Sequence, residues 1–330
     1  MTFFAYSSSL FQISAFRLLL SAFFCGSALF FFRIQNPASN IPLTPRMRYL
    51  VILLLTVALC FGAQSLALRL AGGRTLKSES NFFSSLGRIQ AGAHAKQKIM
   101  VLGSSITGRL PDSAQGFAGI SNMGCDGGNG IDTLRAIDNG ILPSAPWMFV
   151  EANALGLSLT NKPTEISKTM KGPWFQLGIG HPSVSAYGRP AAFFYSNLLA
   201  RKIGAFPREE AERGFQTGTA PVLLGQPSHP DLTSVETALI SEVSAIIQRL
   251  QRSGSKFIFV WLPPARPDSK PPEWITALAE SSHSYWWDLG QNVPLQDVKL
   301  TDGVHMDAAS ATRTTGDLLR AIQYLEQHPR

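Results

Sequence analysis

Five short apolar runs, separated by segments with helical spacing, constrain the fold of this 330-residue chain more than any other feature. Runs that are apolar throughout are typical of parallel strands that helices cover on both faces. The pattern therefore predicts an α/β fold with a mostly parallel, five-stranded sheet. Residues 155–230, rich in Gly, Pro and aromatic residues, break the pattern and predict an insertion of loops and short helices over one end of the sheet. The predicted strands cover residues 99–102, 117–121, 147–151, 256–262 and 284–288.

Two helices are predicted in the C-terminal half of the chain. The first covers residues 235–250, with Thr233 or Ser234 as its N-cap and Gly254 at its end. The second covers residues 308–327. Its inward-facing residues are Leu318, Leu319, Ile322 and Leu325.

The first 72 residues have a different character from the rest of the chain. They carry five arginines and no acidic residue, so they account for most of the formal net charge of +7. Residues 49–68 are uncharged, which is enough length to cross a bilayer as a helix. Two arginines precede this stretch and favour a cytoplasmic start. The alternative is a signal peptide cleaved near residues 65–67. Because the basic charge belongs to this segment, no nucleic-acid partner is expected.

These features divide the chain into four parts. Residues 1–46 are either a first transmembrane helix or sequence upstream of a start at Met47. Residues 47–72 form a transmembrane anchor or signal peptide, residues 73–96 a linker, and residues 97–330 the α/β domain with its insertion. The predicted location of this domain is the periplasmic face of a bacterial inner membrane, or the secreted fraction if the signal is cleaved.

Polar residues follow several predicted strands at their carboxyl ends, where parallel sheets form their sites. Ser105 follows the first strand, Gly127 lies in a glycine-dense segment after the second, and Asn153 lies at the tip of the third. Asp302 and His305 precede the last helix. A serine nucleophile needs a base, and that base needs an acceptor that fixes its tautomer. The structural alternatives are a capping serine, a plain glycine turn and an aspartate that begins a helix.

This order of motifs resembles the SGNH (GDSL-type) hydrolase family over about residues 97–327. The family's Gly-Asp-Ser motif falls on residues 103–105, its Gly-x-Asn-Asp motif on residues 151–154, and its Asp-x-x-His motif on residues 302–305. Ser104 replaces the usual aspartate, and the glycine and second aspartate of the third motif are missing. The resemblance implies a flavodoxin-like three-layer sandwich.

The same resemblance implies a role for each matching residue. Ser105 would be the nucleophile, His305 its base and Asp302 the acid that orients the base. The N–H groups of Ser105 and Gly127 and the amide of Asn153 would form the oxyanion hole. No metal and no other cofactor is expected.

The basic N-terminal segment and the altered motifs resemble the membrane-anchored branch of that family. This branch implies an exported serine esterase that removes acyl groups, in particular acetyl groups, from a carbohydrate or cell-envelope polysaccharide. One alternative is an O-acetyltransferase that moves acetyl groups onto a polysaccharide. A second alternative is a catalytically inactive component that binds polysaccharide or joins its assembly partners.

Aromatic and sulfur side chains add two further expectations. Trp174, in the insertion, is a candidate substrate contact, with ordinary packing as the alternative. Cys125, beside the glycine-dense segment, is not expected to be a nucleophile. The tryptophans expected in the core are Trp147, Trp261, Trp286 and Trp287.

Overall fold

The computed structural model describes residues 44–70, 79–160, 164–225, 231–263 and 270–328. The chain divides into two units, Met1–Gly62 and Ala63–Arg330. Helix α2 (Pro45–Leu70) carries many exposed apolar side chains, among them Leu53 and Leu54.

No helix within the described residues is both long enough and apolar enough to span a bilayer. The anchor expected over residues 47–72 therefore stays a prediction. The expected segment 1–46 lies almost wholly outside the described residues.

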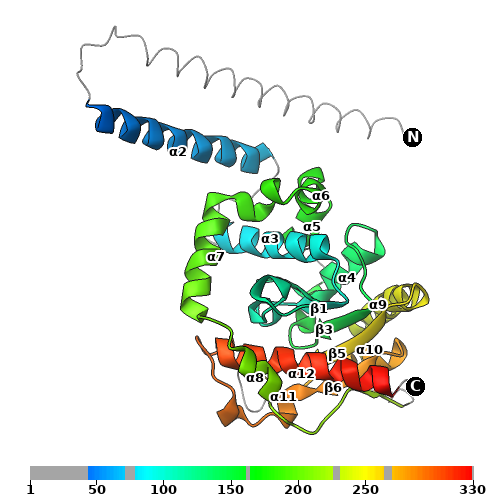
Figure 1. Cartoon of the computed structure of the whole chain (residues 1–330). Coiled ribbons are helices and arrows are strands. Elements are labelled where there is room, and N and C mark those ends of the chain that lie inside the picture. Colours follow the sequence, from blue (N-terminus) through cyan, green and yellow to red (C-terminus); the bar gives the residue numbers. More distant parts are fainter. Residues whose placement is uncertain (1–43, 71–78, 161–163, 226–230, 264–269, 329–330) are drawn as a thin grey trace, which may run out of the picture. The chain divides into compact units, whose positions relative to one another are not determined.

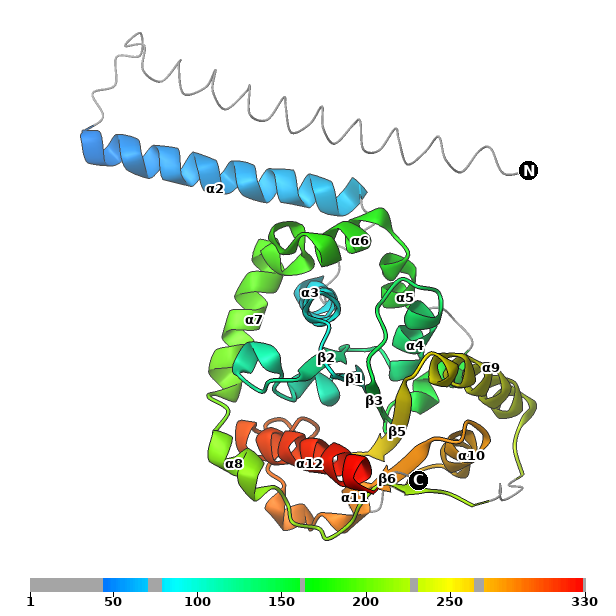
Figure 2. The ribbon, with the colours of Figure 1, turned by 45° about the vertical axis from the view of Figure 1, so that its right-hand side comes forward.

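A six-stranded sheet lies at the centre of the second unit (Figures 1 and 2). Its parallel strands run in the order β2-β1-β3-β5-β6, which is the order of flavodoxin-like folds. The predicted α/β fold with a mostly parallel sheet is confirmed. The strands are β1 (Ile99–Gly103), β2 (Ile120–Gly124), β3 (Trp147–Glu151), β4 (Val222–Leu223), β5 (Lys256–Trp261) and β6 (Tyr285–Asp288).

The sheet corrects the prediction at two points. It has six strands rather than five, because β4 adds a two-residue antiparallel edge beside β6. So short a strand leaves no apolar pattern in the sequence. The second strand begins at Ile120 rather than at residue 117, because Gly119 has φ of 91° and ends a turn there. Asn122 lies inside this strand, and its side-chain amide donates to the carbonyls of Thr107 and Leu110.

Alternate residues of the strands face two separate cores, which gives the predicted three layers. Met100 and Leu102 face one core, and Ile99 and Val101 face the other. Each buried side chain of this size contributes about 1.5–3 kcal/mol. Helix α12 (Ala308–Gln327) covers one face of the sheet (Figure 2). The opposite face is covered by α3 (Glu79–Ala95), α4 (Gly130–Asp138), α9 (Ser234–Arg252) and α10 (Glu273–Ser281). The four tryptophans expected in the core, Trp147, Trp261, Trp286 and Trp287, are buried.

Both helices predicted in the C-terminal half are confirmed. The N-cap of α9 is Thr233, whose side chain accepts from the Glu236 N–H while the Glu236 carboxylate accepts from the Thr233 N–H. Gly254 follows the helix with φ of 101°. Helix α12 has the predicted bounds, and Asp307 caps its start.

The expected linker over residues 73–96 is wrong for most of its length, because α3 occupies residues 79–95. Phe82, Leu86, Ile89 and Ala93 recur at helical spacing and are buried in the core that α3 shares with the sheet. Ser and Gly residues between them hide this apolar stripe in the sequence.

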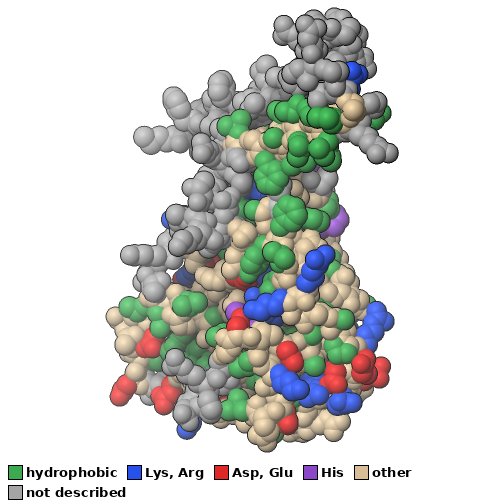
Figure 3. Space-filling model, turned by 90° about the vertical axis from the view of Figure 1, so that its left-hand side faces the viewer, with side chains coloured by type: hydrophobic (Ala, Val, Ile, Leu, Met, Phe, Trp, Pro, Cys, Tyr) green, Lys and Arg blue, Asp and Glu red, His purple; other side chains and the backbone are tan. Residues whose placement is uncertain are grey.

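The predicted insertion at residues 155–230 folds mainly into helices around the two helical layers. Figure 1 shows α7 (Pro190–Ile203) beside α3, and α8 (Arg208–Arg213) beside α12. Near α8 and α12, Glu210 pairs with Arg213 and Arg313, and acidic and basic side chains mix on the lower part of Figure 3. The remaining helices are α5 (Glu165–Met170), α6 (Pro173–Gly180) and α11 (Leu289–Asn292), with 3-10 turns at Thr107–Arg109, Ser113–Gln115, Leu155–Thr160, Pro182–Val184, Ala186–Gly188 and Leu295–Asp297.

Candidate active site

Two loops of the second unit bring Ser105, Asp302 and His305 together. The Nε2 atom of His305 lies 2.8 Å from the Oγ of Ser105. The Nδ1 atom of His305 lies 2.8 Å from one carboxylate oxygen of Asp302 and 3.0 Å from the other. Because a carboxylate only accepts hydrogen bonds, Nδ1 carries the proton and Nε2 accepts from the serine hydroxyl. This is the geometry of a nucleophile, its base and the acid that orients the base.

Ser105 lies in the turn that follows β1. The Gly108 N–H donates to the Ser104 carbonyl at 3.0 Å, which closes the turn. The Ser104 hydroxyl donates to Glu151 at 2.7 Å and accepts from the Ile106 N–H at 3.1 Å. Ser104 is therefore buried, and its hydroxyl is already hydrogen-bonded to Glu151 and Ile106. The half-buried Ser105 faces the imidazole of His305 instead. Of the two serines, only Ser105 is placed to attack a substrate.

Asp302 and His305 share a tight loop before α12. Leu300 and Met306 form an antiparallel bridge that closes the loop, and Gly303 takes φ of 81° at its tip. One carboxylate oxygen of Asp302 also accepts from the His305 backbone N–H at 2.9 Å. The acid is thus fixed to both the backbone and the ring of the residue that it orients.

The local environment keeps Asp302 ionised. Burial alone would raise the pKa of Asp302, but hydrogen bonds from the His305 N–H, the His305 ring and the Val304 N–H outweigh it and lower that pKa to about 2. The carboxylate is therefore present at neutral pH, where it can hold the proton of Nδ1.

The structure does not link the predicted oxyanion residues to Ser105 by any hydrogen bond among the described residues. Gly127 lies exposed in the loop after β2 with φ of 71°, and neither its N–H nor that of Ser105 donates to another described residue. The Asn153 amide donates to the Leu262 carbonyl at 2.9 Å and accepts from the Leu262 N–H at 2.8 Å. One amide hydrogen of Asn153 is thus committed to Leu262, and one is left over. The oxyanion roles stay predictions.

Glu151, at the end of β3, is the member of this site that the sequence analysis missed. Its side chain is fully buried and accepts hydrogen bonds from Ser104 and Thr107, on either side of Ser105. Burial raises the pKa of Glu151, and these hydrogen bonds act in the opposite direction. A glutamate is almost never fully buried without partners, so an acid at the end of an apolar run was the available signal.

Trp174 and Cys125 are the two other residues with an expectation from the sequence. Trp174 is half-buried near the start of α6, a helix that packs on α3 and α5, and its role as a substrate contact stays a prediction. Burial raises the pKa of the Cys125 thiol to about 12. A thiol of that pKa holds almost no thiolate, the reactive form, at neutral pH.

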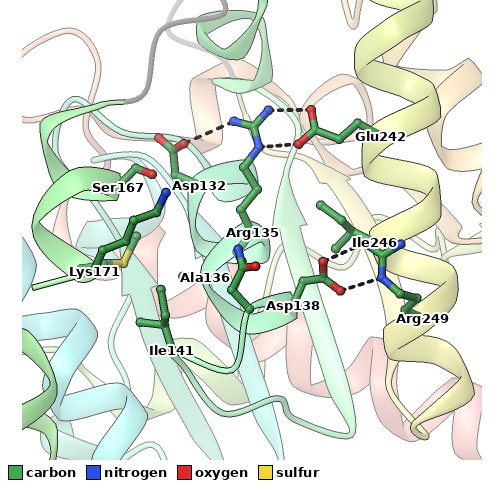
Figure 4. A pocket seen from close by; sticks show the side chains of 12 residues that line it. Asp132, Arg135, Ala136, Asp138, Ile141, Ser167, Lys171, Glu242, Ile246 and Arg249 are labelled. Carbon is green, nitrogen blue, oxygen red and sulfur yellow. Dashed lines mark hydrogen bonds and ion pairs between the residues drawn. The ribbon is translucent and has the colours of Figure 1, made fainter. Parts of the chain in front are cut away.

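A polar pocket between α4, α5 and α9 lies elsewhere and contains none of the predicted site residues (Figure 4). Arg135 pairs with Glu242 at 2.7 Å, and Arg249 pairs with Asp138 at 2.7 Å. Its charges largely neutralise one another, so the pocket offers little to a charged ligand. Within the described residues, no three His, Cys, Asp or Glu side chains come together as metal ligands.

Comparison of the chain with protein-family models, curated proteins and solved structures finds no match. The geometry around Ser105 and the resemblance of the motifs are therefore the features that point to a function.

Proposed function

We propose that this protein is a serine esterase that acts through an acyl-serine intermediate. The observation that carries the proposal is the chain of contacts from Ser105 Oγ to His305 Nε2 and from His305 Nδ1 to Asp302, each 2.8 Å long. Each of the three side chains then has a separate chemical task.

The contacts support a two-step reaction. His305 Nε2 takes the proton of the Ser105 hydroxyl while Oγ bonds to the ester carbonyl carbon. The imidazolium, stabilised by Asp302, then gives its proton to the leaving alcohol as the ester C–O bond breaks. Water attacks the acyl-serine with His305 again as the base, which releases the carboxylic acid and restores Ser105.

The oxyanion of each tetrahedral intermediate needs hydrogen-bond donors. The uncommitted N–H groups of Ser105 and Gly127, with the remaining amide hydrogen of Asn153, are the donors that we propose. Loss of one such donor typically costs about 3 kcal/mol of transition-state stabilisation.

The substrate class and location rest on the sequence. The resemblance favours an acetyl ester on a carbohydrate or cell-envelope polysaccharide, and the basic apolar N-terminal segment favours an anchored domain outside the cytoplasm. If a sugar hydroxyl replaces water in the second step, the same site becomes an O-acetyltransferase.

Hydrolysis of p-nitrophenyl acetate by the purified full-length protein tests the reaction. We expect turnover by the wild type and none above background in Ser105→Ala. Ser241→Ala, which changes an exposed serine on α9, is the matched control and should keep wild-type turnover. Equal turnover in Ser105→Ala and the wild type would overturn the proposal.

A further inference from the structure

A buried carboxyl group joins the end of β3 to the turn that carries Ser105. The Oε2 atom of Glu151 accepts from the backbone N–H groups of Ser104 at 2.8 Å and Thr107 at 3.3 Å, and it lies 3.0 Å from the Thr107 hydroxyl. Its Oε1 atom accepts from the Ser104 hydroxyl at 2.7 Å. Residues on both sides of Ser105 are thus tied to one side chain of a neighbouring strand.

This arrangement sets the position of the nucleophile. Ser105 lies between the two residues that Glu151 holds, so displacement of either residue would move its Oγ from His305. Gly103 leaves the space for the carboxyl group, since a Cβ at this position would overlap the Glu151 side chain. The glycine that ends β1 and the glutamate that ends β3 therefore fit each other.

Both ends of the contact between Ser104 and Glu151 differ from the family pattern that the motifs resemble. That pattern has aspartate at position 104 and glycine at position 151, whereas this chain has Ser104 and Glu151. The Glu151 carboxyl lies within 2.7 Å of the Ser104 hydroxyl, in the space that a side chain at position 104 reaches. In this chain the carboxyl group beside the turn therefore comes from β3.

We propose that Glu151 is a positioning residue for Ser105, and that its carboxyl group takes the place of the aspartate that Ser104 replaces. This inference rests on the proposed function in taking Ser105 as the nucleophile, and on the motif resemblance for the aspartate at position 104. Glu151 does not touch the substrate; it acts by holding the turn in which Ser105 faces His305.

A pair of substitutions separates the shape of the Glu151 side chain from its acidity. In Glu151→Gln the side-chain oxygen still accepts from the two backbone N–H groups, and the new NH₂ group donates to the Ser104 oxygen. We expect kcat for p-nitrophenyl acetate to stay within about tenfold of wild type. In Glu151→Ala the same buried donors lose their acceptor, and kcat should fall by about 10²-fold, the usual effect of a misplaced reacting group, with a smaller change in KM. Equal kcat in folded Glu151→Ala and the wild type would overturn the proposal.

Variants that place the carboxyl group at position 104 instead of position 151 test whether Glu151 substitutes for an aspartate there. Ser104→Asp alone would place two carboxyl groups in one buried site and should reduce activity, because like charges oppose each other there. Glu151→Gly alone should also be impaired. The double variant Ser104→Asp/Glu151→Gly has one carboxyl group again and should exceed both single variants in kcat. A folded double variant no more active than Glu151→Gly would contradict that role of Glu151.

An NMR measurement reads the position of Ser105 without relying on catalysis. In the full-length protein labelled with ¹⁵N-histidine, Ser105→Ala identifies the His305 Nε2 signal by removing its hydrogen-bond partner. Glu151→Ala should shift that signal in the same direction, and Glu151→Gln should leave it near the wild-type position. An unshifted signal in Glu151→Ala would refute the positioning role. If the wild type hydrolyses no ester, the proposed esterase function fails while this comparison still decides the role of Glu151.

Discussion

In the proposed reaction Asp302 lets His305 act as a base, because the carboxylate selects the tautomer in which Nε2 accepts the serine proton. In Asp302→Asn the amide can stabilise the wrong tautomer, so kcat for p-nitrophenyl acetate should fall by roughly 10²- to 10⁴-fold. Far-UV circular dichroism and the melting temperature check that the variant is folded. Near-wild-type turnover in a folded variant would remove Asp302 from the reaction.

The low pKa of Asp302 also predicts how stability depends on pH. Its pKa falls from the ordinary value of 3.8 to about 2 on folding, so the unfolded chain binds the proton more readily. The stabilisation from this carboxylate is therefore complete above about pH 4 and is lost as the pH falls toward 2. Urea denaturation of the wild type and Asp302→Asn should show a stability difference that narrows between these values. A difference that stays constant across this range would contradict the assigned contacts.

For individual side chains, contacts between residues close in sequence were easier to predict than contacts between distant residues. Asp302 and His305 lie three residues apart, and their contact follows from one turn. The partners of Glu151 lie in the turn after β1, as far as 47 residues earlier at Ser104. The amide of Asn153 binds Leu262, 109 residues later. Neither pairing leaves a local pattern, so the hydrogen-bond partners of Glu151 and of Asn153 could not be predicted from the sequence alone.

The end of β2 must approach the nucleophile turn closely, and Gly124 makes that possible. A Cβ at this position would overlap the backbone of Gly108, which cannot rotate away as a flexible side chain can. Gly124→Ala should therefore lower the free energy of unfolding by about 1–3 kcal/mol, the usual cost of overpacking. It should also reduce turnover, because Gly108 belongs to the turn that carries Ser105.

Urea denaturation and ester hydrolysis measure the two effects of Gly124→Ala. Gly156→Ala is the matched control, since no atom lies within 4 Å of its added Cβ. Equal stability of the two variants would show that the close approach of β2 and the turn is not constraining.

Helices and strands were predictable where apolar residues form an unbroken run or recur at helical spacing. The patterns at 147–151 and 308–327 correspond to β3 and α12 without a shift. Helix α3 was missed because its narrow apolar stripe is interrupted by small polar residues and became clear only from its burial against the sheet. The order of the strands depends on pairing between distant segments, so residue spacing did not predict it.

The distribution of charge predicts how the whole molecule is oriented in the cell. All five basic residues of the first 72 are arginines without an acidic counterpart, and two of them precede the apolar stretch. We expect alkaline phosphatase fused to the C-terminus to be active and a reporter that requires the cytoplasm to be silent. The reverse result would exclude a substrate outside the cytoplasm while leaving the chemistry of Ser105 intact.

The central claim is that Ser105 is an activated nucleophile, and a fluorophosphonate serine probe tests it most directly. The probe should label the wild-type full-length protein, and peptide mapping should place the label on Ser105. Ser105→Ala should not be labelled, and Ser241→Ala should be labelled like the wild type. A label on Ser104, or labelling that persists in Ser105→Ala, would contradict the assignment.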